Sequence, residues 1–388
     1  MRLVARPLAL AAVLLAAGLA AGTATAQTRP TLTVSGQLLV NAFYNSGKTN
    51  NSDVPTYADT LTGAEAAGLP THNLGSAVRQ SRLGLTLTGT RALGASITGS
   101  LQVDFFGGQQ PSTGGRTYPL PRVRVATVRA DWSRLSLLVG QDALVIAPVS
   151  PVSFAAFATP LFAHSGNLWF RAPQVRLSAE TSRPARLGVQ GAVIAPLQPL
   201  AQGAILTQPD SAERSGLPNL EGRVYVKWGR GTTASELGFG GHLGWLATTG
   251  DTLLRSRAVA LDARVAVGPH LTLLGEAFSG EALGALGGAV SQNLGRQHVP
   301  VGSRGGWLQA DVRPDAAWEF GGGFGIDDPV DGDLAPGGRE RNLTWAGHVI
   351  WRPGGGLLLG AEFRRIETAY AARTVGVTHL NAYTGLSF

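Results

Sequence analysis

Charged residues spaced two positions apart are the side chains of this sequence that most clearly suggest a chemical role. Arg122 and Arg124 form one such pair, and Arg176 and Glu180 share one parity of a later segment. Because side chains alternate across a β-strand, residues at this spacing point to the same side. Guanidinium groups gathered around an aqueous passage favour anions. The segments that carry these residues therefore have to be strands whose charged face meets water.

Catalytic chemistry is not indicated by the remaining reactive residues. The sequence contains no cysteine, which excludes disulfides, thiolate catalysis and zinc–thiolate sites. His164 and Ser165 are adjacent, so on an extended chain their side chains point apart. Segment 378–381 faintly resembles the histidine segment of outer-membrane phospholipases, but the serine expected with it is missing. We predict that the protein is not an enzyme.

A metal site is a weaker interpretation than a solvated acidic loop. Asp327, Asp328, Asp331 and Asp333 crowd one segment, and oxygen-rich loops can bind calcium. Their spacing departs from the EF-hand pattern, and Pro329 stands where a ligand is needed. We therefore expect no metal and no cofactor.

Alternation of apolar and polar residues runs through segments of about ten residues. In 82–88 every odd position is leucine, and in 97–105 the odd positions 97, 101, 103 and 105 are apolar. This period is the signature of barrel strands with one face toward lipid and one toward water. We predict an all-β fold, a transmembrane antiparallel β-barrel of about 16 strands: 31–44, 77–89, 94–106, 120–132, 134–141, 171–180, 185–194, 220–228, 233–247, 255–267, 270–279, 303–313, 315–325, 341–352, 356–368 and 374–388.

Connectors between these strands alternate between short and long, as in outer-membrane barrels. The third long connector, 142–170, is largely apolar from Ala143 to Ala158. We expect it to fold into the barrel and narrow the channel; the alternative is an external loop buried between subunits. Tryptophans lie near the strand ends, which indicates two aromatic girdles: Trp132, Trp228, Trp318 and Trp351 beside short turns, and Trp245, Trp307 and Trp345 at the opposite end.

Composition and the N-terminal segment agree with export. Only 15% of the residues are charged, against about 25% in an average soluble domain. Arg2 and Arg6 precede an apolar run, and small residues follow at 24–26, so 1–26 is predicted to be a cleaved signal peptide and 27–388 the barrel. The net charge of +7 then falls by two to +5. The arginines are dispersed singly, so no nucleic-acid partner is expected.

Several segments resemble bacterial outer-membrane porins. The last residues, 380–388, look like a C-terminal assembly signal, with Leu386 and the final Phe388 in the characteristic places. Segments 81–85, 103–107, 138–141 and 171–176 resemble those of the DcaP-like porins. The resemblance implies a trimeric porin of 16 strands in the outer membrane of a Gram-negative-type bacterium. It also implies contacts with membrane lipids and lipopolysaccharide, and assembly by the barrel-assembly machinery.

Strand parity then predicts which side chains surround the passage. The expected lumen-facing charges are Arg82, Asp104, Arg122, Arg124, Arg176, Glu180, Arg223, Lys227, Asp262, Arg264, Glu276, Asp311 and Glu319. The predicted constriction beside 142–170 consists of Arg82, Asp104, Arg122, Arg124, Arg171, Arg176 and Glu180. We expect passive diffusion of small hydrophilic, anionic solutes. Two alternatives stay open: arginines that only brace the wall against Asp104 and Glu180, and a non-conducting barrel with a structural or surface-contact role.

Deletion of Phe388 tests the expected assembly signal. Because the final aromatic residue ends the strand that resembles the recognition signal, the deletion is expected to reduce the amount of folded barrel. The measurement is the quantity of heat-modifiable protein in the outer membrane. Wild-type levels after the deletion would count against this role.

Overall fold

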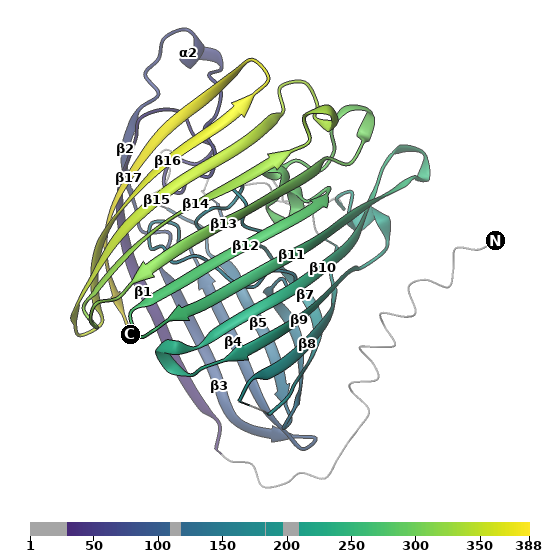
Figure 1. The fold of residues 1–388 in the computed structure, drawn as a ribbon, viewed down its shortest axis with the longest axis vertical. Helices are drawn as coiled ribbons and strands as arrows, with labels where there is room; N and C mark the ends of the chain where they lie inside the picture. Colours follow the sequence, from purple (N-terminus) through teal and green to yellow (C-terminus); the bar gives the residue numbers. More distant parts are fainter. Residues whose placement is uncertain (1–28, 109–117, 183, 197–208) are drawn as a thin grey trace.

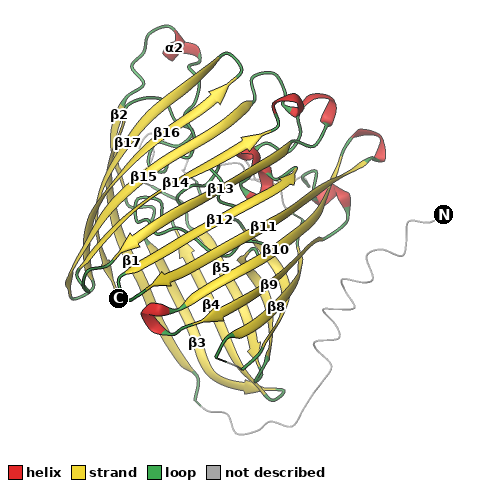
Figure 2. Cartoon of the chain, viewed as in Figure 1, coloured by secondary structure: helices red, strands yellow, loops and turns green. Residues whose placement is uncertain are grey.

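The computed structural model describes residues 29–108, 118–182, 184–196 and 209–388, and the predicted signal peptide lies outside the described residues. The strands are β1 (Thr31–Asn45), β2 (Asn73–Ala77), β3 (Arg82–Ala92), β4 (Ala95–Asp104), β5 (Arg122–Asp131), β6 (Leu135–Ala143), β7 (Arg171–Glu180), β8 (Arg186–Ile194), β9 (Asn219–Trp228), β10 (Ser235–Ala247), β11 (Leu253–Val267), β12 (Leu271–Glu281), β13 (Gly302–Val312), β14 (Trp318–Pro329), β15 (Arg339–Gly354), β16 (Leu357–Tyr370) and β17 (Arg373–Ser387). Within these described ranges, one short helix, α2 (Gly63–Ala66), and single 3₁₀ turns lie in the connectors (Figure 2).

These strands form one closed antiparallel barrel (Figure 1). From β3 to β17 each strand pairs with the next along the chain, β17 pairs back onto β1, and β1 also pairs with β2 and β3. Pairing of β17 with β1 removes the two terminal edges that an open sheet would expose, which suits a sheet in lipid. Among the described residues, no helix combines the length and apolar character needed to cross a membrane.

The barrel has sixteen strand positions because β2 and β3 share one of them. β2 pairs with β1 from Asn41 to Asn45, and β3 pairs with β1 from Thr31 to Gln37. Seventeen strands on sixteen positions confirm the predicted barrel. The single strand predicted at 77–89 was wrong in one respect: it is interrupted at 78–81, where the Ser81 hydroxyl accepts a hydrogen bond from Leu39 N (2.9 Å) and donates one to Leu39 O (3.2 Å).

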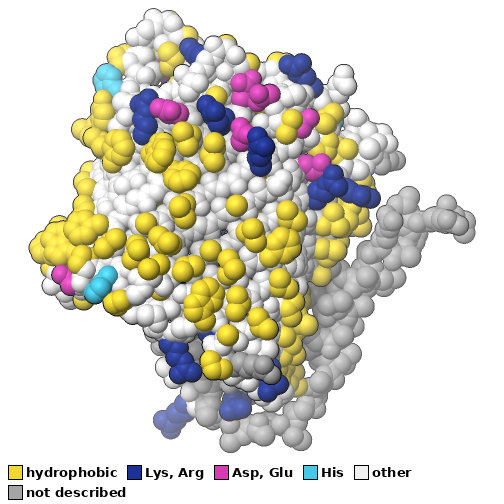
Figure 3. Space-filling model, viewed as in Figure 1, with side chains coloured by type: hydrophobic (Ala, Val, Ile, Leu, Met, Phe, Trp, Pro, Cys, Tyr) yellow, Lys and Arg dark blue, Asp and Glu magenta, His cyan; other side chains and the backbone are white. Residues whose placement is uncertain are grey.

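The outer surface carries the apolar half of the alternation. Leu83, Leu85 and Leu87 of β3 are exposed, and similar side chains form a band between two ends where charged side chains gather (Figure 3). Trp318 stacks on Trp351 near the short turns, with ring centroids 5.9 Å apart. These positions suit an aromatic girdle.

Trp307 corrects the predicted girdle at the opposite end. It is buried inside the barrel, where its ring stacks on Phe162 with centroids 5.9 Å apart. Its indole N–H donates to Glu276 Oε2 (3.2 Å). Trp307 is the sixth of the eleven residues of β13, not near its end, and its side chain faces inward and contacts Phe162 instead of lipid.

Residues 144–170, here named the third loop, lie against the inner faces of many strands. Leu144, Val145 and Ile146 pack with Ile194 of β8 and Ala260 of β11. Farther along, Leu161 and Phe162 pack with Leu274 of β12 and Trp307 of β13, and Ala155 packs with Leu39, Ile350 and Tyr383 of β1, β15 and β17. Because these strands surround the lumen, the apolar loop provides the hydrophobic core of the barrel interior.

Glycines in the wall let the loop backbone approach closely. A Cβ atom at Gly240 of β10 would lie 2.1 Å from the Ile146 carbonyl oxygen, and one at Gly325 of β14 would lie 2.2 Å from the Ser165 carbonyl oxygen. Such distances are far inside van der Waals contact, so any side chain there would displace the loop. The observed position of the loop backbone therefore requires glycine at these two wall positions, Gly240 of β10 and Gly325 of β14.

Replacing Gly240 with alanine tests this packing, and Gly241 is a matched control because a Cβ there has no neighbour nearer than 3.8 Å. Overpacking a core typically costs about 1–3 kcal/mol. Gly240→Ala is expected to lower the temperature at which the barrel loses its heat-modifiable gel mobility, whereas Gly241→Ala leaves it nearly unchanged. Equal transition temperatures for the two variants would mean that the third loop does not press on β10.

Candidate functional site

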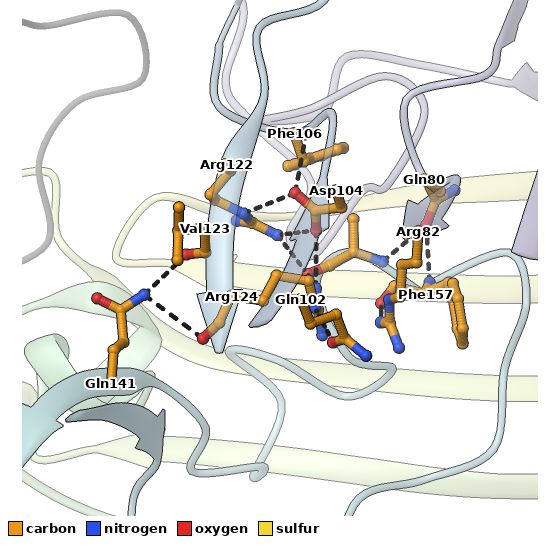
Figure 4. A network of polar contacts seen from close by, with 11 residues as sticks. Gln80, Arg82, Gln102, Asp104, Phe106, Arg122, Val123, Arg124, Gln141 and Phe157 are labelled. Carbon is orange, nitrogen blue, oxygen red and sulfur yellow. Dashed lines mark hydrogen bonds and ion pairs between the residues drawn. The ribbon is translucent and has the colours of Figure 1, made fainter. Parts of the chain in front are cut away.

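Asp104 holds two arginines where β4 ends and β5 begins. Asp104 lies directly opposite Arg122 in the register, and Arg124 follows on the same face. Arg122 donates to Asp104 from Nε (3.0 Å) and Nη2 (2.7 Å), and Arg124 donates from Nη1 (2.8 Å), as Figure 4 shows. Asp104 is fully buried. Forked guanidinium–carboxylate contacts of this type are strong and directional.

The same arginines also contact the third loop. Arg122 Nη2 and Arg124 Nη1 both donate to the Ala158 carbonyl oxygen, at 2.8 and 3.1 Å. Arg82 of β3 donates to the Phe157 carbonyl oxygen, and its guanidinium carbon lies 3.3 Å from the centroid of the Phe157 ring. A guanidinium has five N–H donors, so it can bind a carboxylate and a carbonyl together. These arginines therefore position the loop as well as carrying charge.

The interruption between β2 and β3 contributes Gln80 to this contact (Figure 4). Gln80 Oε1 accepts hydrogen bonds from Phe157 N (2.7 Å) and Ala158 N (3.0 Å), and its Nε2 donates to Ala155 O (3.2 Å). An unbroken strand would fix the alternation of side chains through this region. The irregular backbone at 78–81 is thus part of how the loop is held, and nothing in the local sequence identified Gln80.

Positive charge exceeds negative charge where these arginines meet the third loop. Arg82, Arg124 and Arg171 line a cavity of about 310 Å³ together with apolar loop residues such as Phe157 and Trp169. Within the described part of the chain, no carboxylate oxygen lies within 4.0 Å of the Arg82 or Arg171 guanidinium nitrogens. The four predicted arginines 82, 122, 124 and 171 and the single Asp104 sum to a formal charge of +3. We name these five residues the basic cluster.

Two of the sequence-predicted residues form other pairs. Arg176 of β7 pairs with Asp142 of β6. Glu180 accepts from Arg186 (2.9 Å) and from the Tyr225 hydroxyl (3.1 Å), and lies 3.7 Å from Lys227. Glu180 therefore has basic partners of its own, near the short turns, and none of them is an arginine of the basic cluster.

A register shift in β5 affects the parity below the basic cluster. Gln102 and Val103 of β4 pair with Val125 and Val123 of β5, so Arg124 is skipped in the pairing. The alternation of side chains therefore changes along β5. Arg129 and Asp131 consequently line a second inner cavity of about 250 Å³ together with Arg176 and Glu180. Parity counted from Arg122 would place these two residues on the lipid side.

Buried acids and amides elsewhere on the wall hold the rest of the loop. Glu221 Oε2 of β9 accepts from Val145 N (2.6 Å) and Ile146 N (3.0 Å). Other wall side chains bind loop groups in the same way: Gln309 binds Val152 N and O at 2.9 Å each, Glu362 accepts from Ser153 Oγ at 2.5 Å, Glu276 accepts from Leu168 N at 2.9 Å and Asn342 donates to His164 O at 2.8 Å. Parity placed Glu276 in the lumen, but its loop partner could not be read from the sequence.

Histidine and aspartate residues considered for chemistry have structural contacts. His164 Nδ1 lies 2.8 Å from Thr56 Oγ1, while Ser165 Oγ lies 2.8 Å from Thr344 Oγ1. Burial, with a contribution from Arg339, lowers the pKa of His164 to about 4, so this histidine adds no charge at pH 7. The solvated acidic loop was wrong for Asp327, which is buried in β14 and binds Ser303 Oγ (2.5 Å) and Val290 N (3.0 Å).

Known structures share this architecture. The outer membrane channel DcaP of Acinetobacter baumannii is 16% identical, with a TM-score of 0.71 over 94% of this chain and 100% of that chain. The barrel has the porin fold. The anion-selective porin from Comamonas acidovorans is also 16% identical, with a TM-score of 0.57 over 93% and 100% of the two chains. The trimer form of OmpT from Vibrio cholerae is 10% identical, with a TM-score of 0.52 over 92% and 99%.

Comparison by sequence gave no relative: no protein-family model and no curated protein matches the chain. The structural likeness confirms the fold implied by the resemblance to DcaP-like porins, and at these identities it establishes the fold alone.

Asp104→Asn tests the role of the buried carboxylate. The change leaves two arginines without their counter-charge, and removing one partner of a buried pair costs about 3–5 kcal/mol. Asp131→Asn is the matched control, because the Arg129–Asp131 pair (2.8 Å) has side chains 51% and 36% exposed, and such pairs contribute about 1 kcal/mol or less. The measurement is the free energy of unfolding in lipid by denaturant titration. Equal losses would show that Asp104 does not hold the arginines against the loop.

Proposed function

We propose that the protein is an outer-membrane porin that allows passive diffusion of small hydrophilic anions. The observation that carries this proposal is the formal charge of +3 on the basic cluster, where Arg82 and Arg171 face a cavity beside the third loop without carboxylate partners. Fixed positive charge at a narrow place raises the local concentration of anions. Because the Debye length is about 10 Å at 0.1 M salt, charges this close to the passage outweigh distant ones.

The contacts divide the predicted constriction residues into two roles. Arg122 and Arg124 are bound by Asp104 and by the Ala158 carbonyl, which favours bracing of the loop. The Arg171 side chain makes no hydrogen bond or ion pair with the described residues, so its guanidinium is the one most available to a passing solute. We therefore assign the anion selectivity first to Arg171 and Arg82. The same two residues, together with the third loop, form the proposed constriction of the passage.

Location and assembly follow from the same proposal. A closed barrel with an apolar outer band suits a membrane, and the predicted signal peptide directs the chain for export. We place the barrel in the outer membrane as a homotrimer, in contact with lipids and lipopolysaccharide and inserted by the barrel-assembly machinery. At the closing seam, Phe388 O accepts from Gly36 N (3.0 Å) and Leu386 faces outward, which suits an assembly signal. No enzymatic activity is proposed.

The second candidate is a non-conducting barrel, which the extensive burial of the third loop inside the lumen favours. Single-channel current in planar bilayers separates the two functions directly. Discrete ohmic steps are expected for the porin. Folded, inserted protein that carries no current would establish the blocked barrel instead.

Arg171→Gln tests the selectivity. Because Arg171 has no partner to lose, the variant is expected to fold normally while the reversal potential in a salt gradient moves toward that of a cation-preferring channel. Arg171→Lys, which keeps the charge, should restore most of the wild-type value.

Arg129→Gln is the matched control, because Arg129 is paired with Asp131 and lies outside the basic cluster. Its reversal potential should remain close to that of the wild type. A shift for Arg129→Gln as large as that for Arg171→Gln would show that total lumen charge, and not the basic cluster, sets the selectivity.

A further inference from the structure

Three lumen-facing side chains that could bind a metal converge on the wall far from the basic cluster. Asp311 of β13, Glu319 of β14 and His348 of β15 each offer one ligand atom, and these atoms lie within 4.8 Å of one another. All three residues are buried. None of them hydrogen-bonds directly to the third loop, although Asp311 accepts from Gln309, which binds Val152 of the loop.

The strand register builds a cradle for them around a missing side chain. Asp311 and His348 both pair with Gly321, from the strands on its two sides. Glu319 precedes Gly321 by two residues and so shares its face. A Cβ atom at Gly321 would lie 2.3 Å from Asp311 Oδ1 and 2.5 Å from His348 Nε2. Glycine at this position is therefore what allows the carboxylate and the imidazole to lean toward each other.

Potential ligand atoms in this cradle lack hydrogen-bond partners. His348 Nε2, Asp311 Oδ2 and Glu319 Oε1 are buried without one. His348 Nε2 lies 3.7 Å from Asp311 Oδ1, which is too long for a hydrogen bond. Buried polar atoms of this kind are rare, because burying a polar group without a hydrogen-bond partner is costly. An imidazole nitrogen and two carboxylates aimed at one point therefore call for a shared partner.

We infer that Asp311, Glu319 and His348 form a binding site for a divalent transition-metal ion of the zinc type. One nitrogen and two carboxylate oxygens suit zinc, which takes three protein ligands with a water as the fourth. Calcium and magnesium prefer oxygen ligands only. In a tetrahedral zinc site the ligand atoms lie about 3.4 Å apart, so ligand atoms now within 4.8 Å of one another have to approach by up to about 1.4 Å.

Neighbouring groups complete the site and its access. Glu319 Oε2 lies 2.9 Å from Arg313 Nη2 and 2.7 Å from Arg352 Nη2, which orients the carboxylate and leaves Oε1 for the ion. Gln309 Nε2 donates to Asp311 Oδ1 (3.0 Å) and orients the second carboxylate. The arginine side chains are 53% and 31% exposed, so an ion from the aqueous lumen would enter past them.

Zinc titration of the purified folded barrel, followed by calorimetry, tests the site. Wild-type protein is expected to bind one Zn²⁺ per chain and to show no comparable uptake of Mg²⁺. His348→Gln and Asp311→Asn should weaken zinc binding by more than about tenfold, and Gly321→Ala should do the same by filling the cradle while keeping all three ligands. His298→Gln, which removes an exposed histidine outside the barrel wall, should bind as the wild type does.

Two results would overturn the site: no zinc uptake by the wild type, or undiminished uptake by folded His348→Gln. X-ray absorption at the zinc edge of the wild-type complex needs no variant and is decisive if the variants fail to fold. One imidazole among oxygen neighbours supports the site. Two or more imidazoles would place the ion on exposed histidines instead.

Discussion

The attachment of the third loop to the inner wall is the interaction on which the rest of the barrel depends. An apolar loop in the lumen buries its own peptide groups, and each buried N–H or C=O without a partner is costly. Wall side chains supply those partners: Glu221, Gln309 and Glu276 from distant strands, and Gln80 from the interruption beside β1. Glycines such as Gly240 admit the loop backbone.

The same constraint explains why charge is uneven around the lumen. Wall acids such as Glu221 and Glu276 accept hydrogen bonds from N–H groups of the third loop, so these carboxylates are occupied by contacts within the protein. On the side of β3 to β7, the loop presents carbonyl oxygens, which need donors, and arginines fill that role. The need for hydrogen-bond donors beside the Ala158 carbonyl thus places guanidinium groups at the cavity. The excess of their positive charge over the negative charge of Asp104 gives the proposed anion preference.

The alternation of apolar and polar residues was sufficient to predict the barrel, but it was insufficient to predict the side-chain contacts inside it. The two-residue period located nearly every strand because lipid and water impose it on each strand separately. It could not show that Trp307 stacks on Phe162, that Glu180 binds Arg186, or that Asp327 is buried, because these depend on neighbouring strands and on loops. Register shifts, such as the one at Gln102, change parity without any local signal.

A designed disulfide measures most directly whether the third loop lies against the wall. The chain has no cysteine, so a Ser165→Cys, Thr344→Cys pair is free of competing thiols. The native hydroxyl oxygens lie 2.8 Å apart, which places the two side chains within reach of a disulfide. The account predicts nearly complete bond formation in the folded barrel under mild oxidation, detected as loss of free thiols by mass spectrometry. Two persistently free thiols in folded protein would contradict it.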